Sequence, residues 1–165
     1  MNLMRTCYRT LPAAAAALLL AACHSASRPD SVPTAIKAGQ SWVVTRPLVA
    51  AQVIDTCSRP GPASLDGGVT GYWAPSRAQV DQLEAALDQL AGQIADPRAS
   101  GRQYVGIENG SRRLIYINAF KLPDTAGLNP AREAVRVCDG GEGFWGAIYD
   151  PAGNSFSHIE RNGGY

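Results

Sequence analysis

The sequence predicts an α+β fold in which one amphipathic helix packs on an antiparallel β-meander, in two layers. Residues 77–94 repeat apolar side chains at helical spacing. The C-terminal half carries short β-prone segments that are separated by turns rich in glycine, asparagine and proline. A helix with one apolar stripe must bury that stripe against another element, here one face of the sheet.

The N-terminal segment has the pattern of a bacterial lipoprotein signal. Two arginines precede an apolar run over residues 11–22, which is too short to span a bilayer as a helix. The sequence Leu20-Ala21-Ala22-Cys23 resembles a lipobox. The resemblance implies that residues 1–22 are a signal peptide that is removed, and that Cys23 is then lipidated. The alternative is an ordinary cleaved signal followed by a coincidental cysteine.

The remainder divides into a tether and one domain. Residues 23–40 are small, polar and proline-bearing, which indicates a flexible tether, and residues 41–165 have the length of a single domain. Of the 15 basic residues, loss of Arg5 and Arg9 leaves 13 against 14 acidic ones, a formal charge of −1. Without a basic cluster we expect no nucleic-acid partner, and membrane contact through the acyl chains.

Cys57 and Cys138 are expected to form a disulfide. Cys7 leaves with the signal and Cys23 carries lipid, so these two cysteines are the pair that remains in the domain. The oxidising compartment that a lipoprotein enters favours the bond. Two independent buried thiols are the alternative. Metal binding is disfavoured, because the two cysteines are far apart in sequence and have no paired histidine.

The first half of the domain combines β-prone and helical segments. Residues 42–54 are rich in β-branched side chains, and Pro47 removes a ladder donor, so we expect one interrupted edge strand or two short strands. Residues 57–71 are loop. The helix over 77–94 begins at Ser76, with Gln79 completing a capping box, and stops before Pro97.

A β-hairpin is expected over residues 104–120. Asn109-Gly110 supplies the two positive-φ positions of a type I′ turn. That turn pairs Val105 with Leu114 and places both on one face of the hairpin together with Tyr116.

Three further strands are expected, at 133–138, 144–149 and 155–160, with turn sequences between them. The order of elements resembles cystatin-like arrangements, in which a sheet wraps a helix. This likeness concerns the fold and implies no function.

The glycine-rich loop at 139–143 is the most distinctive candidate for a binding surface. Residues 141–146 match G-x-G-x-x-G, but a β-prone segment follows where a phosphate loop needs a helix, which disfavours a nucleotide site. Phe144 and Trp145 are adjacent, so on a strand they point to opposite faces. If Trp145 lies on the open face beside Asp139 and Glu142, the loop is a rigid platform for a protein partner. The alternative is an ordinary hairpin loop with Trp145 in the core.

Motifs for catalysis, metals and cofactors are missing from the sequence. Neither His24 nor His158 lies in a recognisable nucleophile setting. Scattered acids such as Asp55, Asp139 and Glu160 leave a carboxylate-dependent hydrolase as a third possibility.

Several blocks resemble an uncharacterised family of small secreted or lipid-anchored bacterial envelope proteins. The resemblance covers residues 57–164 and implies a shared fold but no catalytic residue. It is carried by Gly71-Tyr72-Trp73-Ala74-Pro75-Ser76, Arg102-Gln103-Tyr104-Val105-Gly106-Ile107, Tyr116-Ile117-Asn118-Ala119-Phe120, Cys138-Asp139-Gly140-Gly141, Phe144-Trp145-Gly146, Tyr149-Asp150-Pro151 and Asn162-Gly163.

Together these features predict a non-enzymatic periplasmic lipoprotein that binds a protein partner, most concretely an inhibitor or immunity protein against a toxin or cell-wall hydrolase. Asp139, Glu142, Phe144 and Trp145 are the expected contact residues. The alternative is an envelope assembly component that docks to a membrane complex. His24 follows the acylated cysteine where an inner-membrane retention signal has aspartate, so we expect the outer membrane, facing the periplasm.

Overall fold

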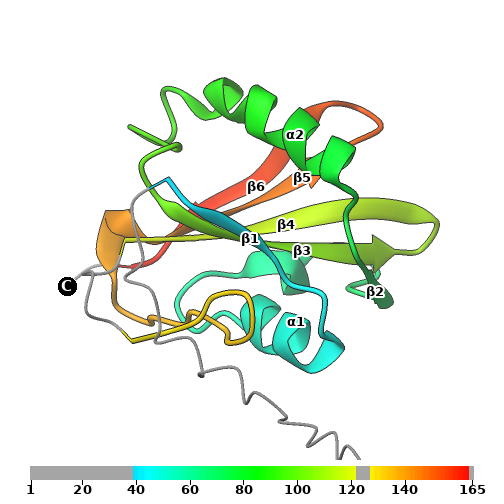
Figure 1. The fold of residues 1–165 in the computed structure, drawn as a ribbon, viewed down its shortest axis with the longest axis horizontal. Coiled ribbons are helices and arrows are strands. Elements are labelled where there is room, and N and C mark those ends of the chain that lie inside the picture. Colours follow the sequence, from blue (N-terminus) through cyan, green and yellow to red (C-terminus); the bar gives the residue numbers. More distant parts are fainter. Residues whose placement is uncertain (1–38, 122–126, 164–165) are drawn as a thin grey trace, which may run out of the picture. The chain divides into compact units, whose positions relative to one another are not determined.

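A computed structural model describes residues 39–121 and 127–163, and in them it shows the expected α+β class. Figure 1 shows one sheet with a helix on either side. The strands are β1 (Ser41–Val43), β2 (Gly71–Trp73), β3 (Gly101–Asn109), β4 (Arg112–Phe120), β5 (Trp145–Asp150) and β6 (Ser155–Arg161). The helices are α1 (Pro47–Ile54) and α2 (Arg77–Ala86), and the 3-10 turns are η1 (Gly61–Ser64), η2 (Leu87–Leu90) and η3 (Gly141–Gly143).

The expected signal peptide, Cys23 and nearly all of the tether lie outside the described residues, so lipidation stays a prediction. Within the described ranges, no helix has the length and apolar character needed to cross a membrane.

The sheet has six strands in the order β1-β3-β4-β5-β6, with β2 also paired to β3. The four strands β3 to β6 form the expected antiparallel meander. β1 is the exception, because it runs parallel to β3. β6 is an edge strand whose pairing with β5 shifts register near His158, a residue with a φ of 49°.

α2 covers one face of the sheet through the predicted apolar stripe. Leu83 and Leu87 are fully buried in a core cluster with strand residues such as Ile117. The predicted capping box is present, with Ser76 and Gln79 bonded reciprocally. The α-helix is shorter than predicted: it ends at Ala86 and continues as η2.

A buried polar group pins α2 to β3. The Tyr104 hydroxyl donates to Glu84 Oε1 over 2.7 Å, and Arg102 Nη2 lies 3.1 Å from Glu84 Oε2. Arg102 Nε also donates to the Tyr104 hydroxyl. Burial raises the pKa of Tyr104 well above its ordinary value.

α1 covers the opposite face and corrects the sequence analysis, which expected β structure throughout residues 42–54. Only Ser41–Val43 is a strand, and Pro47 begins a helix. Proline is suited to this first helical position, because the N–H that it lacks has no partner there. Val49 and Val53, four residues apart, face the sheet. Helical layers therefore cover both faces rather than one.

The hairpin is present but its register differs from the prediction. Asn109 pairs with Arg112 and Val105 pairs with Tyr116, so the turn consists of Gly110 and residue 111. Gly110 takes the positive φ, at 60°, and Asn109 stays in the strand. The register moves by two residues, which keeps each side chain on its predicted face.

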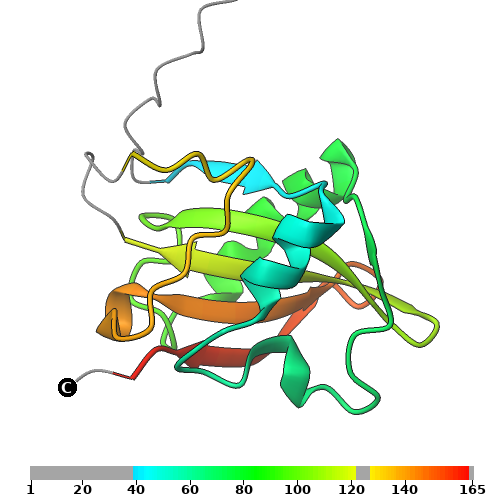
Figure 2. The same ribbon diagram turned by 90° about the horizontal axis from the view of Figure 1, so that it is seen from below.

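The prediction of a strand at residues 133–138 is wrong. This segment joins no ladder, although its apolar residues made it β-prone. Figure 2, which views the molecule from below, shows this orange stretch crossing in front of the strands on the same side as α1. We call residues 127–138 the covering segment.

Candidate functional site

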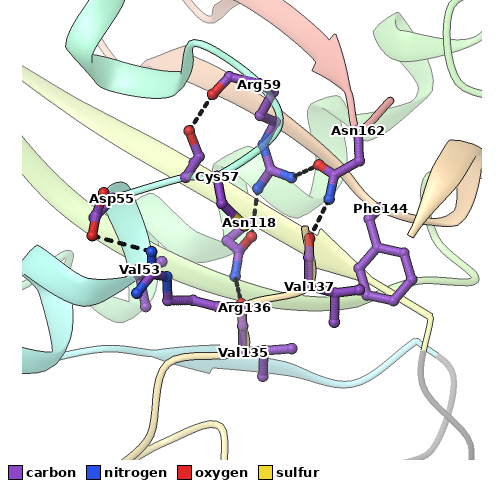
Figure 3. A pocket seen from close by; sticks show the side chains of 11 residues that line it. Val53, Asp55, Cys57, Arg59, Asn118, Val135, Arg136, Val137, Phe144 and Asn162 are labelled. Atoms are coloured by element: carbon purple, nitrogen blue, oxygen red, sulfur yellow. Dashed lines mark hydrogen bonds and ion pairs between the residues drawn. The ribbon is translucent and has the colours of Figure 1, made fainter. Parts of the chain in front are cut away.

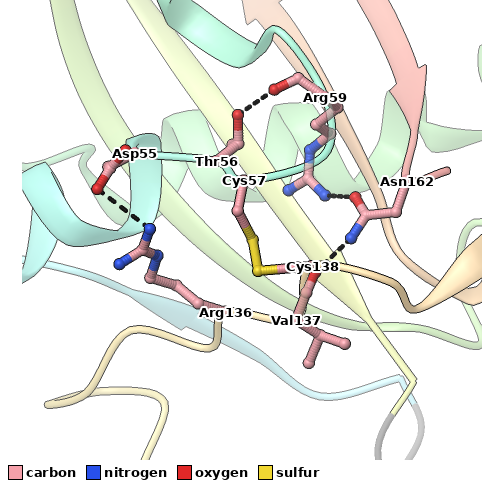
Figure 4. The surroundings of a disulfide bond; sticks show 8 residues. All are labelled: Asp55, Thr56, Cys57, Arg59, Arg136, Val137, Cys138 and Asn162. Carbon is pink, nitrogen blue, oxygen red and sulfur yellow. Dashed lines mark hydrogen bonds and ion pairs between the residues drawn. A yellow bond between two sulfur atoms is a disulfide. The ribbon is translucent and has the colours of Figure 1, made fainter.

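A disulfide attaches the covering segment to the loop that follows α1. Cys57 and Cys138 are joined as predicted, with 5.1 Å between their Cα atoms and a separation of 81 positions in sequence (Figure 4). Both cysteines are exposed to solvent. Beside the disulfide, Arg136 Nη2 pairs with Asp55 Oδ2 at 3.1 Å.

Arg59 lies buried beneath this crosslink. Its Nε donates to the Tyr116 hydroxyl over 3.0 Å. Its Nη2 donates to Asn118 Oδ1 over 2.6 Å and its Nη1 to Asn162 Oδ1 (Figure 3). All three acceptors are neutral, and no carboxylate among the described residues forms an ion pair with Arg59. Burial raises the pKa of Tyr116, and the guanidinium opposes this shift.

Gly146 on β5 makes room for the Arg59 side chain. A Cβ atom at Gly146 would lie 2.6 Å from the Tyr116 hydroxyl oxygen and 2.8 Å from Arg59 Nε. The sheet face therefore needs glycine here to accept a guanidinium against its backbone.

Three side-chain amides hold the backbone of the covering segment. Gln103 on β3, Asn118 on β4 and Asn162 after β6 form what we call the amide row. They donate to the backbone carbonyl oxygens of Glu133 over 2.6 Å, Val135 over 2.8 Å and Val137, respectively. The Val135 N–H in turn donates to Gln103 Oε1 over 3.0 Å.

The bonded carbonyls belong to alternate residues, which is the repeat of an extended backbone. The segment thus runs across the sheet, from β3 past β4 toward the end of β6, bound by side chains instead of a ladder.

Two apolar residues of the covering segment are buried, Pro130 and Val135. Val135 is 3% exposed and forms a small cluster with Phe120 of β4. Trp42, Leu128 and Phe144 pack around this pair. Trp42, Phe120, Leu128 and Phe144 thus surround Val135, and we call these four residues the apolar seat.

A cavity lies between the covering segment, the disulfide loop and Arg59. Its volume is about 10 Å³, which is room for one water molecule and not for a substrate. The polar groups around it therefore serve, in this state, to hold protein segments together.

The loop at residues 139–144, here called the acidic loop, begins directly after the disulfide. Asp139 and Glu142 are exposed, and Glu142 Oε1 lies 3.8 Å from Arg161 Nη1. Phe144 is partly buried in the apolar seat. After η3 the chain enters the strand β5, as predicted, and not the helix that a phosphate-binding loop requires.

Trp145 is 1% exposed and donates its indole N–H to Ser100 Oγ over 3.1 Å. It packs in the core cluster under α2, while Phe144 packs in the apolar seat. Of the two placements that the sequence left open, Trp145 thus occupies the core, where its side chain is not accessible to a partner. Asp139 and Glu142 remain accessible.

The other acids singled out in the sequence have structural partners. Asp55 pairs with Arg136, and Glu160 Oε2 accepts the Gly61 N–H over 2.7 Å. His158 is exposed and contacts Ser157. Among the described residues, no group of three or more histidine, cysteine or acidic side chains could hold a metal ion.

Sequence reasoning missed Arg59 and assigned no role to the amide row. The available signal was an amide side chain inside an otherwise apolar strand, as at Gln103 and Asn118. Such residues require partners that lie elsewhere in the chain.

Comparisons with protein-family models, curated proteins and solved structures find no match to this chain. The class of protein is therefore defined by its own architecture: an α+β domain with a disulfide-attached segment across one sheet face.

Proposed function

We propose that this protein is a non-enzymatic lipoprotein of the cell envelope that binds a protein partner through the acidic loop, as an inhibitor or immunity protein against a toxin or hydrolase. The observation that carries the proposal is how firmly the acidic loop is held while Asp139 and Glu142 stay exposed.

Both ends of the acidic loop are fixed. Its start follows Cys138, which is covalently bound to Cys57. Its end is bonded to the residue that follows β6, because the Asn162 N–H donates to the Phe144 carbonyl over 2.8 Å. The N–H of Gly141 donates to the Gly163 carbonyl over 3.3 Å in the middle of the loop.

A loop fixed in this way loses little conformational entropy when a partner binds it. Two exposed carboxylates on such a loop complement a partner with basic groups around its active site, and they favour fast, specific association. These are the properties that an inhibitory protein requires.

A pull-down tests the acidic loop. Oxidised protein spanning residues 24–165 is the bait for periplasmic and secreted proteins, and Asp139→Lys is compared with Asp66→Lys, another exposed acid. We expect one enzyme to bind the wild type and Asp66→Lys, to be lost with Asp139→Lys, and to lose activity at a 1:1 ratio.

If Asp139→Lys captured the enzyme as well as the wild type does, the role of this loop would be refuted. Capture of membrane-complex subunits, with no inhibited enzyme, would support the assembly role instead.

The anchor is tested separately. Globomycin-sensitive processing and membrane fractionation are measured for Cys23→Ser, with Cys7→Ser as the matched control. We expect Cys23→Ser to leave the membrane fraction and Cys7→Ser to stay there. A membrane-bound Cys23→Ser protein would contradict lipidation at this residue.

A further inference from the structure

We propose that the amide row and the apolar seat form a groove for an extended peptide, and that the protein's own residues 133–137 occupy this groove while the Cys57–Cys138 disulfide is intact. Reduction of the disulfide would open the groove to a peptide from another protein. This inference does not depend on the proposed inhibitory function.

The contacts in the groove are those of peptide recognition. The amides of Gln103, Asn118 and Asn162 bond to main-chain groups at residues 133, 135 and 137. Main-chain contacts give affinity for any extended chain, and side-chain pockets at alternate positions give specificity. The one filled pocket here is the seat of Val135, which selects a small branched apolar side chain.

The amide row also reaches the buried Pro130, whose carbonyl accepts from Gln103 Nε2 over 2.7 Å. Little else binds the stretch 131–137 to the sheet. It joins no ladder, and of residues 132–137 only Val135 is fully buried. Arg132, Glu133 and Arg136 are exposed. Segments with few buried apolar contacts open at lower free energy than the core they cover. The disulfide is therefore the strongest restraint on this segment.

The disulfide is accessible to a reductant, because both of its cysteines are exposed. A dithiol reductant of the thioredoxin class attacks one sulfur as a thiolate, which breaks the S–S bond and forms a mixed disulfide. Its second thiol then resolves the mixed disulfide. The protein gains two thiols, and the reductant, which supplies two electrons and two protons, becomes a disulfide.

Hydrogen exchange measures the first step. In the reduced protein we expect the amides of residues 131–138 to exchange about tenfold faster or more, while those of β3 and β4 keep their protection. Unchanged exchange at Val135 would overturn the proposal. So would loss of protection throughout the sheet, because the disulfide would then be needed for the whole fold.

Peptide binding measures the second step. The probe is a fluorescent peptide with the sequence of residues 131–137, Ala-Arg-Glu-Ala-Val-Arg-Val. In reduced protein the tethered segment competes at an effective concentration on the order of millimolar. The probe is therefore offered to Val135→Asp, in which an aspartate weakens the tethered segment's hold on the apolar seat.

We expect reduced Val135→Asp to bind the probe at least about tenfold more tightly than the oxidised form does, because the groove opens on reduction. A control peptide with proline at position 135 lacks the N–H that Gln103 accepts and should bind about tenfold more weakly. Equal binding by both redox forms, or of both peptides, would refute the groove. Both peptides are offered to the same protein, so their difference does not reflect a change in its stability, and the hydrogen-exchange measurement tests the groove on the wild type.

Discussion

At the scale of single residues, Arg59 is the most consequential side chain of the described region. A buried guanidinium without a carboxylate partner depends on neutral acceptors, and it is stable only if they are well placed. Here the three acceptors come from two parts of the chain: Tyr116 and Asn118 lie on one face of β4, and Asn162 follows β6. Arg59 thus joins the disulfide loop to the sheet.

Arg59→Ala is expected to lower the free energy of unfolding by about 3 kcal/mol, because it leaves buried amide oxygens without donors. Urea unfolding of the oxidised protein measures the change. Arg132→Ala is the matched control, since Arg132 is exposed and is expected to have little effect. An Arg59→Ala protein as stable as Arg132→Ala would show that the network is not structural.

The buried tyrosines predict a loss of stability in alkali. Burial raises the pKa of Tyr104 in the folded state, so above pH 10 the unfolded state loses the proton first. Stability that is intact below pH 10 therefore declines as the pH rises further. Between pH 10 and pH 11 the free energy of unfolding of the wild type falls as the unfolded state ionises. In Tyr104→Phe this fall should be smaller by about 1 kcal/mol. Urea midpoints across this range check it, and an unchanged slope would contradict it.

At the scale of elements, local signals predicted well what local interactions determine. Ser76 and Gln79 specify the start of α2, and Gly110 specifies a hairpin. α1 was missed because its β-branched residues favour strands, whereas its structure depends on Pro47 at the first helical position and on burial against the sheet. Packing against the sheet therefore determines that this segment is a helix and not a strand.

The capping box of α2 gives a prediction at this scale. Ser76→Ala removes the acceptor for the Gln79 N–H and is expected to cost about 1 kcal/mol of stability. Ser111→Ala, at an exposed serine in the hairpin turn, is the control and should change the urea midpoint little. Equal midpoints for the two variants would mean that packing alone fixes the helix start.

The covering segment illustrates why the candidate site could not be predicted in full. Its alternating pattern was recognised as extended, but its partners are the amide row and not a neighbouring strand. The sequence likewise did not determine whether Phe144 or Trp145 enters the main core. Adjacent strand residues point to opposite faces, and either ring can face α2. Only the three-dimensional positions of Ser100 and Phe120 resolve the choice.

At the scale of the whole molecule, the disulfide closes most of the domain into one loop. The pairing was predictable, because elimination left two cysteines for an oxidising compartment. The sequence did not predict that the disulfide is exposed to solvent or that it lies beside the buried Arg59.

Replacement of both cysteines, Cys57→Ser with Cys138→Ser, is expected to lower the free energy of unfolding by about 4 kcal/mol, from the greater entropy of the unfolded chain. The oxidised wild type is the reference, and the reduced wild type should match the double variant. A change below about 1 kcal/mol would indicate strain that offsets the entropic gain.

The separation of Arg59 from Asn162 also constrains how the domain is made. These two bonded side chains are 103 positions apart. A ribosome that has synthesised everything up to β5 has produced a guanidinium with one of its acceptors still missing, and a sheet without its last strand. Contacts of such long range slow folding. The order of events is therefore synthesis first and closure afterwards, and a chain truncated before residue 162 should be a target for proteolysis rather than a smaller working domain.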